Sequence, residues 1–205
     1  MLELFEKSTE FMGLPKKAES EGYKLVHYSG EHIHAITQFI ADVYYSSKNF
    51  SFECTYESLL NDLELEDKLF CAVSDVLCVY NRDNELCCTG RIISKEYNVL
   101  LPFEKEFNFD LNFFMGNGRK VYEFARLASS SKNSFFLISS IFRGLCRLIG
   151  SENNVVIAGL DKRVYDSFTK RRFPIYNIGE PKYYLGSYTV PIGIKLSEAY
   201  SLFNT

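Results

Sequence analysis

The sequence predicts an α/β (α+β) fold in which a mixed, mostly antiparallel sheet carries helices on both faces. Segments with β-like patterning alternate with segments whose apolar residues recur at helical spacing. Hairpin-like strand pairs come first and strand–helix–strand units follow, an order that places antiparallel and parallel pairs in one sheet. The composition is 46% hydrophobic and 16% aromatic, which is enough to build a buried core and argues against disorder.

The first half of the chain opens with helical patterns. A short amphipathic helix is expected over residues 2–12, because Gly13-Leu14-Pro15 would end it. Apolar residues recur at helical spacing from Glu31 to about Ser46 and predict a second helix. The other elements expected here are a strand at Tyr23–Tyr28, a helix at Tyr56–Leu65, and β-like runs at Leu69–Val73, Val76–Tyr80 and Leu86–Ser94.

The second half begins with a strand that is apolar on both faces. Val121–Ala128 follows an irregular stretch from Tyr97 to Gly118. A strand of this kind suits the centre of a sheet that is covered on both sides. Beyond it we expect a helix at Ser134–Ile149, a strand at Val155–Leu160, a helix at Val164–Lys170 and two or more strands within Phe173–Leu196.

Length and cysteine usage favour one intracellular domain. With 205 residues and no linker-like stretch, we expect a single domain over residues 1–205, with residues 1–20 as an N-terminal helical extension. The first residues lack the features of a signal peptide, and no segment is apolar for long enough to span a bilayer. The six cysteines show no CxxC spacing, so we expect reduced thiols and a cytoplasmic location. His32 and His34 have no third ligand in view, and no metal is expected.

The charges are divided unevenly along the chain. Residues 1–118 carry a net charge of −10 and residues 119–205 a net charge of +7, within a total of −3. One interpretation is that the second half attracts an acidic partner, and the other is that two solvated faces simply differ. No basic run interleaved with aromatic residues marks a nucleic-acid groove, so nucleic acid is not expected as a partner.

Three short motifs, in order, resemble one enzyme family. The first is Gly90-Arg91-Ile92, followed by Leu101-Pro102 and the acidic and aromatic segment Phe103–Phe107. The second is Glu123-Phe124-Ala125-Arg126-Leu127-Ala128, and the third is the Tyr-x-Gly…Pro pattern of Tyr184–Pro191. Together, over about residues 86–196, they resemble the N-acyl amino acid synthases and the autoinducer (acyl-homoserine lactone) synthases.

The resemblance implies a GNAT-like acyltransferase. Members of that family move a fatty acyl group from a thioester, often on acyl carrier protein, to a primary amine, which belongs to an amino acid in one branch and to S-adenosylmethionine in the other. It implies for this chain an acyl carrier protein or coenzyme A thioester as donor, an amine such as that of an amino acid as acceptor, and no permanently bound cofactor. The loop Ser129–Ser134 lacks the glycines that cradle the pyrophosphate of coenzyme A in general GNAT acetyltransferases, which favours a carrier-protein donor.

Glu123 is the first candidate catalytic residue. Amine attack on a thioester needs a base, support for the oxyanion and an exit for the thiolate. A carboxylate in an otherwise apolar strand is costly to bury unless it is paired or functional. A β-bulge between Glu123 and Arg126 would bring both side chains to one face and expose backbone amides for the thioester carbonyl. The alternative is a buried structural ion-pair network of Glu123, Arg126 and Arg91.

Tyr165 and Arg91 each have a functional and a structural interpretation. Tyr165 is the candidate acid for the leaving thiolate, because Phe168 and Arg172 stand where the family often has Tyr and Gly. A buried core tyrosine is the alternative. Arg91 is a candidate clamp for an acceptor carboxylate, and the alternative is a surface pair with Glu96.

The remaining candidates are the walls of the pocket and the docking site of the donor. Phe124, Leu127 and Ala128 are expected to line the substrate pocket. Ser130 and Lys132 in the loop, with Arg143 and Arg147 on the following helix, are candidates for binding a donor phosphate or the carrier protein. Helix capping and a solvated helix face are the alternatives. An acetyl-coenzyme A-dependent GNAT acetyltransferase and a non-catalytic GNAT-like domain that binds an acyl ligand or a partner remain open as functions.

Overall fold

One mixed sheet runs through the chain, which the computed structural model describes for residues 9–10, 19–47, 53–96, 98–115, 118–130, 134–150 and 153–203. In these residues nine strands form one sheet in the order β1-β2-β3-β4-β5-β6-β9-β7, with β8 paired to β9. Every pair is antiparallel except β5–β6. The strands are β1 (Thr9–Glu10), β2 (Lys24–Ser29), β3 (Ser74–Tyr80), β4 (Leu86–Ser94), β5 (Val121–Ser129), β6 (Val155–Asp161), β7 (Ile175–Asn177), β8 (Lys182–Tyr184) and β9 (Ser187–Ile194).

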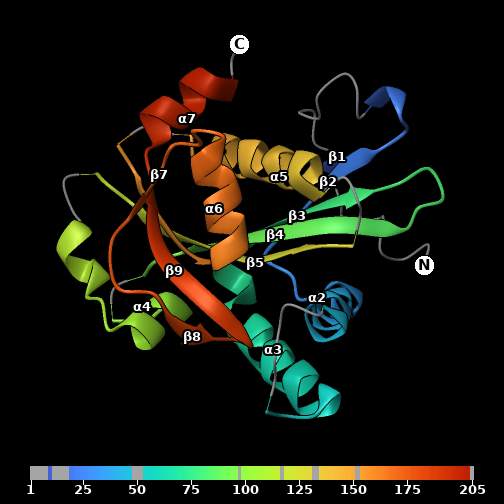
Figure 1. Ribbon diagram of the computed structural model, residues 1–205, viewed down its shortest axis with the longest axis horizontal. Coiled ribbons are helices and arrows are strands. Elements are labelled where there is room, and N and C mark those ends of the chain that lie inside the picture. The colour runs from blue at the N-terminus through green and yellow to red at the C-terminus, as the bar shows by residue number, and fades with distance from the viewer. Residues whose placement is uncertain are drawn as a thin grey trace.

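Helices cover both faces of this sheet, as Figure 1 shows. Helices α5 (Ser134–Ile149) and α7 (Leu196–Phe203) lie on one face, and α2 (His34–Ser46), α3 (Tyr56–Phe70) and α4 (Pro102–Phe107) lie on the other. Helix α6 (Lys162–Lys170) follows β6 and packs with α5, while η2 (Cys71–Val73) and η3 (Leu111–Phe114) are short 3₁₀ turns. The predicted mixed, mostly antiparallel sheet with helices on both faces is confirmed.

Helix α5 packs its apolar stripe on the centre of the sheet. Leu137, Ile141 and Leu145, three of the residues on this stripe, are at most 3% exposed and pack in one cluster with residues of β3, β4 and β5. Burying a side chain of this size contributes about 1.5–3 kcal/mol. On the opposite face, Ile40 of α2 and Leu63 of α3 pack in one cluster with residues of β2, β3 and β5. The central strand β5 is therefore covered on both sides.

Two sequence predictions are wrong in their local structure. Leu69–Val73 is not a strand: Leu69 and Phe70 complete α3 and residues 71–73 form η2, because Phe70 belongs to the buried helical stripe of Leu59 and Leu63. The helix expected over residues 2–12 lies largely outside the described residues. Where it is described, Thr9–Glu10 is a strand that pairs with β2.

The structure also contains helical elements that the sequence did not predict. Helix α4 and η3 fall in the stretch expected to be irregular, and α7 follows the last expected strand. Helix α3 begins at an N-cap, Thr55, whose side chain accepts a hydrogen bond from Ser58 N at 3.2 Å.

Strand β5 is bulged and then parts from β6. Against β4, Thr89 pairs with Ala128 but Arg91 pairs with Ala125, so β5 has one extra residue opposite Gly90. Arg126, at the bulge, has a φ of 57°. The pairs between β5 and β6 end at Phe124 and Ala158, although both strands continue beside their other neighbours. The expected bulge is present, and the two strands form a fork.

A fully buried ion pair fixes the segment that faces this fork. Lys95 Nζ lies 2.7 Å from Glu104 Oε2, and both side chains are 0% exposed. The Glu104 carboxylate also accepts hydrogen bonds from Leu101 N at 2.9 Å and Leu111 N at 3.0 Å. One carboxylate therefore binds the N-cap of α4 and the first residue of η3, and the first turn of α4 lies against β5.

Breaking this pair is expected to destabilise the fold strongly. Lys95→Met leaves the Glu104 carboxylate buried without its cation, which costs about 3–5 kcal/mol. The double variant Lys95→Met/Glu104→Gln is expected to regain part of that loss, because it retains an acceptor and buries no charge. Urea unfolding measures both. If Lys95→Met costs no more than Lys105→Met, a change at an exposed lysine of α4, the pair does not stabilise this segment.

Candidate active site

A cavity of about 310 Å³ occupies the fork between β5 and β6. Its floor is formed by residues 123–129 of β5 and residues 159–161 of β6. Its walls come from both faces of the sheet, with Phe103 and Phe107 of α4 on one side and Ile138 of α5 on the other. The cavity therefore passes through the sheet at the point where the two strands part.

A hairpin covers one side of the cavity. Leu185 and Gly186, with φ values of 46° and 78°, make the two-residue turn that joins β8 to β9. Tyr184 and Leu185 line the cavity from this hairpin. Lys182 of β8 pairs with Glu106 of α4, so the hairpin is tied to the helix across the cavity.

Glu123 is the buried member of three acidic residues that line this cavity, the others being Glu66 and Asp161. Glu123 lines the wall and is 6% exposed, and its Oε2 accepts a hydrogen bond from Phe103 N, the first-turn amide of α4, at 3.1 Å. Burial raises the pKa of Glu123 from 4.5 to about 7, a rise that the Phe103 amide and the guanidiniums of Arg91 and Arg126 oppose and the nearby Glu66 carboxylate reinforces. A carboxylate with this pKa exchanges protons near neutral pH.

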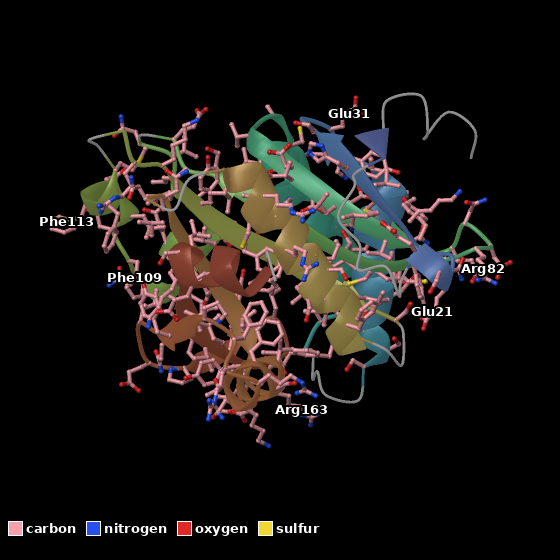
Figure 2. All side chains as sticks on the ribbon, turned by 90° about the horizontal axis from the view of Figure 1, so that it is seen from above. Glu21, Glu31, Arg82, Phe109, Phe113 and Arg163 are labelled. Atoms are coloured by element: carbon pink, nitrogen blue, oxygen red, sulfur yellow. The ribbon has the colours of Figure 1, made fainter. Side chains whose placement is uncertain are left out.

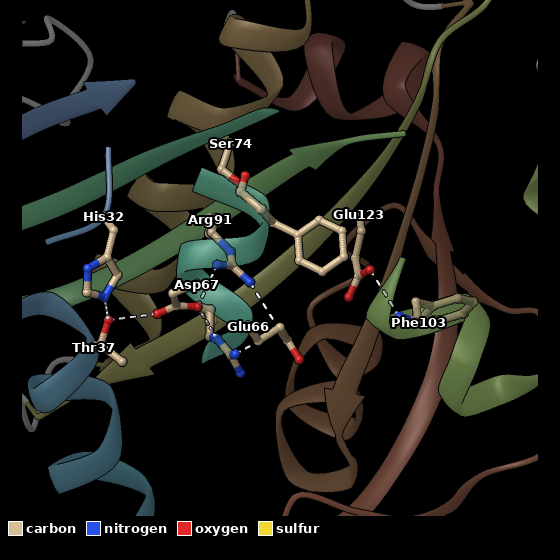
Figure 3. Close-up of polar contacts among 10 residues, drawn as sticks. His32, Thr37, Glu66, Asp67, Ser74, Arg91, Phe103 and Glu123 are labelled. Carbon is tan, nitrogen blue, oxygen red and sulfur yellow. Dashed lines mark hydrogen bonds and ion pairs between the residues drawn. The ribbon is translucent and has the colours of Figure 1, made fainter. Parts of the chain in front are cut away.

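The two arginines form a separate network with α3, shown in Figure 3. Arg126 donates to Asp67 Oδ1 from Nε at 2.9 Å and to Glu66 Oε1 from Nη2 at 2.7 Å. Arg91 donates to the same two carboxylates, and Thr37 donates to Asp67 Oδ2 at 2.7 Å. Burial alone would raise the pKa of Asp67, but the two guanidiniums hold it below its usual value.

The network corrects two interpretations of the sequence. Glu123 points to Phe103 and makes no ion pair with either arginine among the described contacts, so the buried network of Glu123, Arg126 and Arg91 is wrong in its acidic members. Arg91 does not pair with Glu96 at the surface, because its side chain is 4% exposed and contacts Glu66 and Asp67. The acids of α3 could not be assigned to this site from motifs alone.

The predicted pocket residues lie where β5 borders the fork. Phe124, Leu127 and Ala128 line the cavity, as does Arg126. Arg91 is not among the lining residues; it borders a much smaller hollow behind β4 and β5, which it shares with Arg126 and Asp67. The structure brings together the three pocket residues and Arg126 at the bulge. Arg91 lies outside the cavity and shares the carboxylates of Glu66 and Asp67 with Arg126.

The residues predicted to serve the donor are dispersed. Ser130 borders a hollow that shares Val43, Ser47 and Ser129 with the cavity, whereas Lys132 lies outside the described residues. Arg143 and Arg147, further along α5, line none of these hollows among the described residues. Arg163, in the first turn of α6, does line the cavity, and Figure 2 labels it beside that helix.

Tyr165 faces away from the site, and another tyrosine lies inside it. Tyr165 packs against the core cluster of α5 and is not among the described lining residues of the cavity. Tyr184 lines the cavity, and burial raises its pKa well above the usual value, with Glu66 and Glu123 among the nearby charges. Tyr184 belongs to the Tyr-x-Gly motif, so the sequence contained the signal, but the motif alone did not indicate a side chain in the cavity.

Comparison with solved structures identifies the fold. The chain is similar to FeeM, described as an N-acyl amino acid synthase from uncultured soil microbes, with 16% identity, a TM-score of 0.62 and coverage of 95% of this chain and 92% of that one. It is also similar to the AHL synthase LasI, with 15% identity, a TM-score of 0.57 and coverage of 85% and 89%. An acyl-CoA N-acyltransferase from Pseudomonas aeruginosa matches with 11% identity, a TM-score of 0.52 and coverage of 84% and 99%.

These structural neighbours are acyltransferases, and the fold is GNAT-like. The resemblance seen in the motifs is confirmed at the level of the fold. No family model and no curated protein matches the sequence. Among the described helices, none has the length and apolar character that crossing a membrane requires.

The raised pKa of Glu123 predicts a pH-dependent stability. The folded chain keeps a proton on Glu123 up to about pH 7, whereas the unfolded chain releases it near 4.5. The free energy of unfolding therefore falls by about 3 kcal/mol as the pH rises from 4.5 to about 7, and Glu123 changes it no further at higher pH. Glu123→Gln has no carboxylate to ionise, so it is expected to gain stability over wild type between about pH 4 and pH 8. Urea unfolding measures the difference in the free energy of unfolding between the variant and wild type. If that difference is the same at about pH 4 and about pH 8, Glu123 is not a buried ionisable group.

Proposed function

We propose that this chain is an N-acyltransferase that moves a fatty acyl group from an acyl carrier protein or coenzyme A thioester to a primary amine, such as that of an amino acid. The main support is the position of Glu123, whose buried carboxylate has a pKa of about 7 and lies in the cavity where β5 and β6 part. The GNAT-like fold and its acyltransferase neighbours support the same class of reaction.

Glu123 acts as the base toward the amine. Its Oε2 is held by the Phe103 amide, which fixes the carboxylate beside the cavity. The amine nitrogen gives a proton to the carboxylate, directly or through one water, as it forms its bond to the thioester carbonyl carbon. A pKa near 7 suits this transfer at neutral pH, because about half of the carboxylates are then ionised and each is still basic enough to take the proton.

The bulge provides support for the carbonyl oxygen. Beyond Phe124 the β6 side of β5 is no longer paired with a strand, and residues 125–129 line the cavity there. Backbone amides on this edge are fixed donors, which is the arrangement that stabilises an oxyanion. Arg126 is held by Glu66 and Asp67, so the network of α3 fixes the bulged backbone.

Tyr184 replaces Tyr165 as our proposed acid for the leaving thiolate. Burial raises its pKa, so the hydroxyl stays protonated and available to donate. As the carbon–sulfur bond breaks, the hydroxyl proton passes to the sulfur. The proton that Glu123 took from the amine then passes to Tyr184, directly or through solvent, which restores both residues. Tyr184 faces the cavity from the hairpin, opposite the floor formed by β5.

The walls of the cavity favour a fatty acyl donor over an acetyl donor. Phe103, Phe107 and Ile138 are among its apolar lining residues, and such walls would hold an alkyl chain by burying its surface. Arg163 and the hydroxyl side chains of Ser129 and Ser130 lie at or beside the cavity, where they suit the phosphate of a phosphopantetheine arm. A cytoplasmic location, where such donors are made, remains part of the proposal.

Replacing Glu123 tests the base. Glu123→Gln is expected to lower kcat/KM for acyl transfer by about a hundredfold or more and to abolish the acid limb of the pH–rate profile, which in wild type has its midpoint near 7. Initial rates of amide formation with octanoyl thioesters and an amino-acid mixture, followed by mass spectrometry across pH, measure both.

The matched control is Glu57→Gln, a change of the same type at an exposed residue in the first turn of α3. It should leave the rate and its pH dependence unchanged. A folded Glu123→Gln variant with the rate and profile of wild type would show that this carboxylate is not the base.

The two tyrosines test the acid. Tyr184→Phe is expected to slow transfer from an alkyl thioester by about a hundredfold but to affect an aryl thioester far less, because an aryl thiolate leaves without a proton. Tyr165→Phe, on the core side of α6, should leave both rates near wild type. If Tyr184→Phe slows the two donors equally, the hydroxyl does not protonate the leaving group.

A further inference from the structure

Gly159 is a glycine in the middle of a regular strand. The pairing of β6 with β9 is unbroken from Val156–Ile194 to Asp161–Thr189, and Gly159 is absent from the described residues with positive φ. Such a backbone accepts any residue, and strands favour β-branched or aromatic side chains. An interior glycine in a strand often marks a place where a ligand or another backbone comes close.

Crowding explains two comparable glycines but not Gly159. A Cβ at Gly90 would lie 2.5 Å from Ile141 Cγ2, and one at Gly193 would lie 2.4 Å from Tyr176 Cζ, so packing excludes a side chain at both. At Gly159 the nearest atoms are Thr189 Cγ2 at 3.0 Å and Phe107 Cε2 at 3.4 Å. These contacts are tight but would allow a methyl group after a small shift, so neighbouring protein atoms do not by themselves require glycine.

The position of Gly159 beside the cavity gives a different reason for a glycine there. It is the first residue of β6 beyond the last pair with β5, Phe124–Ala158, and it lines the cavity. Ile157, two residues earlier, pairs with Glu123, and side chains two apart on a strand point to the same face. A side chain at Gly159 would therefore enter the passage through the sheet on the α4 side, close to Phe107.

We propose that Gly159 determines the length of acyl chain that the site accepts, by keeping the narrow end of the fork open. This inference rests on the proposed function. With the thioester carbonyl at the bulge and the carrier arm toward Ser129 and Ser130, the acyl chain extends toward the closed end of the fork. There it passes Gly159 between β6 and the ring of Phe107.

The test compares donors of different length on one variant. Gly159→Val adds branched carbons in the passage, so it is expected to lower kcat/KM for a tetradecanoyl thioester, relative to the shortest acyl thioester that wild type uses, by about tenfold or more. Acetyl, butanoyl, octanoyl and tetradecanoyl thioesters of coenzyme A and of carrier protein serve as donors, with an amino-acid mixture as acceptor. The ratio for two donors does not depend on how much of the variant is folded.

Two further variants separate chain length from strain. Gly179→Ala meets similar crowding, 3.2 Å from Pro191 Cγ and 3.3 Å from Phe109 Cζ, but lies outside the described lining of the cavity, so its donor ratio should equal that of wild type. Gly159→Ala/Thr189→Ser removes the methyl nearest the new Cβ and keeps the Thr189 hydroxyl, which bonds Tyr184 O and Ser187 O. This double variant should fold like wild type and still disfavour the longest chain.

The possible results separate the role of Gly159 in chain-length selection from the proposed acyltransferase activity. Reduced use of long donors in both Gly159 variants, with Gly179→Ala unchanged, supports the inference. If wild type transfers acyl groups and the Gly159 variants keep its donor ratio, the inference is wrong and the proposed function stands. If wild type transfers from none of the thioesters, the proposed function is wrong and this inference fails with it.

Discussion

The parting of β5 from β6 is the constraint on which the rest of the site depends. Two parallel neighbours stop pairing at Phe124 and Ala158, and each remains in the sheet only through its other neighbour. Unpaired backbone in a sheet is costly unless water or a ligand satisfies it. Here the gap becomes a cavity lined from both faces of the sheet, so the break in strand pairing creates a place for an extended ligand.

Two sets of buried charges, one on α3 and one on α4, hold this gap in shape from the same face of the sheet. Arg91 and Arg126 share Glu66 and Asp67, which ties the bulge to α3. Lys95 and Glu104 hold α4 so that its first amides face β5. Glu123 makes no ion pair among the described contacts, and its burial raises its pKa. A structural pair keeps its charge because it is matched, whereas this carboxylate is left free to gain and lose a proton.

The fold followed from the sequence where periodicity was clear. Leu86–Ser94 and Ser134–Ile149 have the predicted bounds, because a long apolar pattern determines both the element and its buried face. Helix α4 was missed because six residues carry too little periodicity, and its position depends on the distant contact between Lys95 and Glu104. Glu123 and the bulge were predictable because a carboxylate interrupts an apolar strand. The acids of α3 and the cavity position of Tyr184 depend on tertiary contacts that no local pattern encodes.

The most direct test is a crystal structure of the chain with an acyl-pantetheine ketone analogue, in which a methylene group replaces the thioester sulfur so that no transfer occurs. We expect the ketone oxygen to face the backbone of residues 125–128, the alkyl chain to pass between Gly159 and Phe107, and β5 and β6 still to part after Phe124 and Ala158. An analogue bound elsewhere, or strands that stay paired beyond that point with Glu123 enclosed, would contradict this expectation.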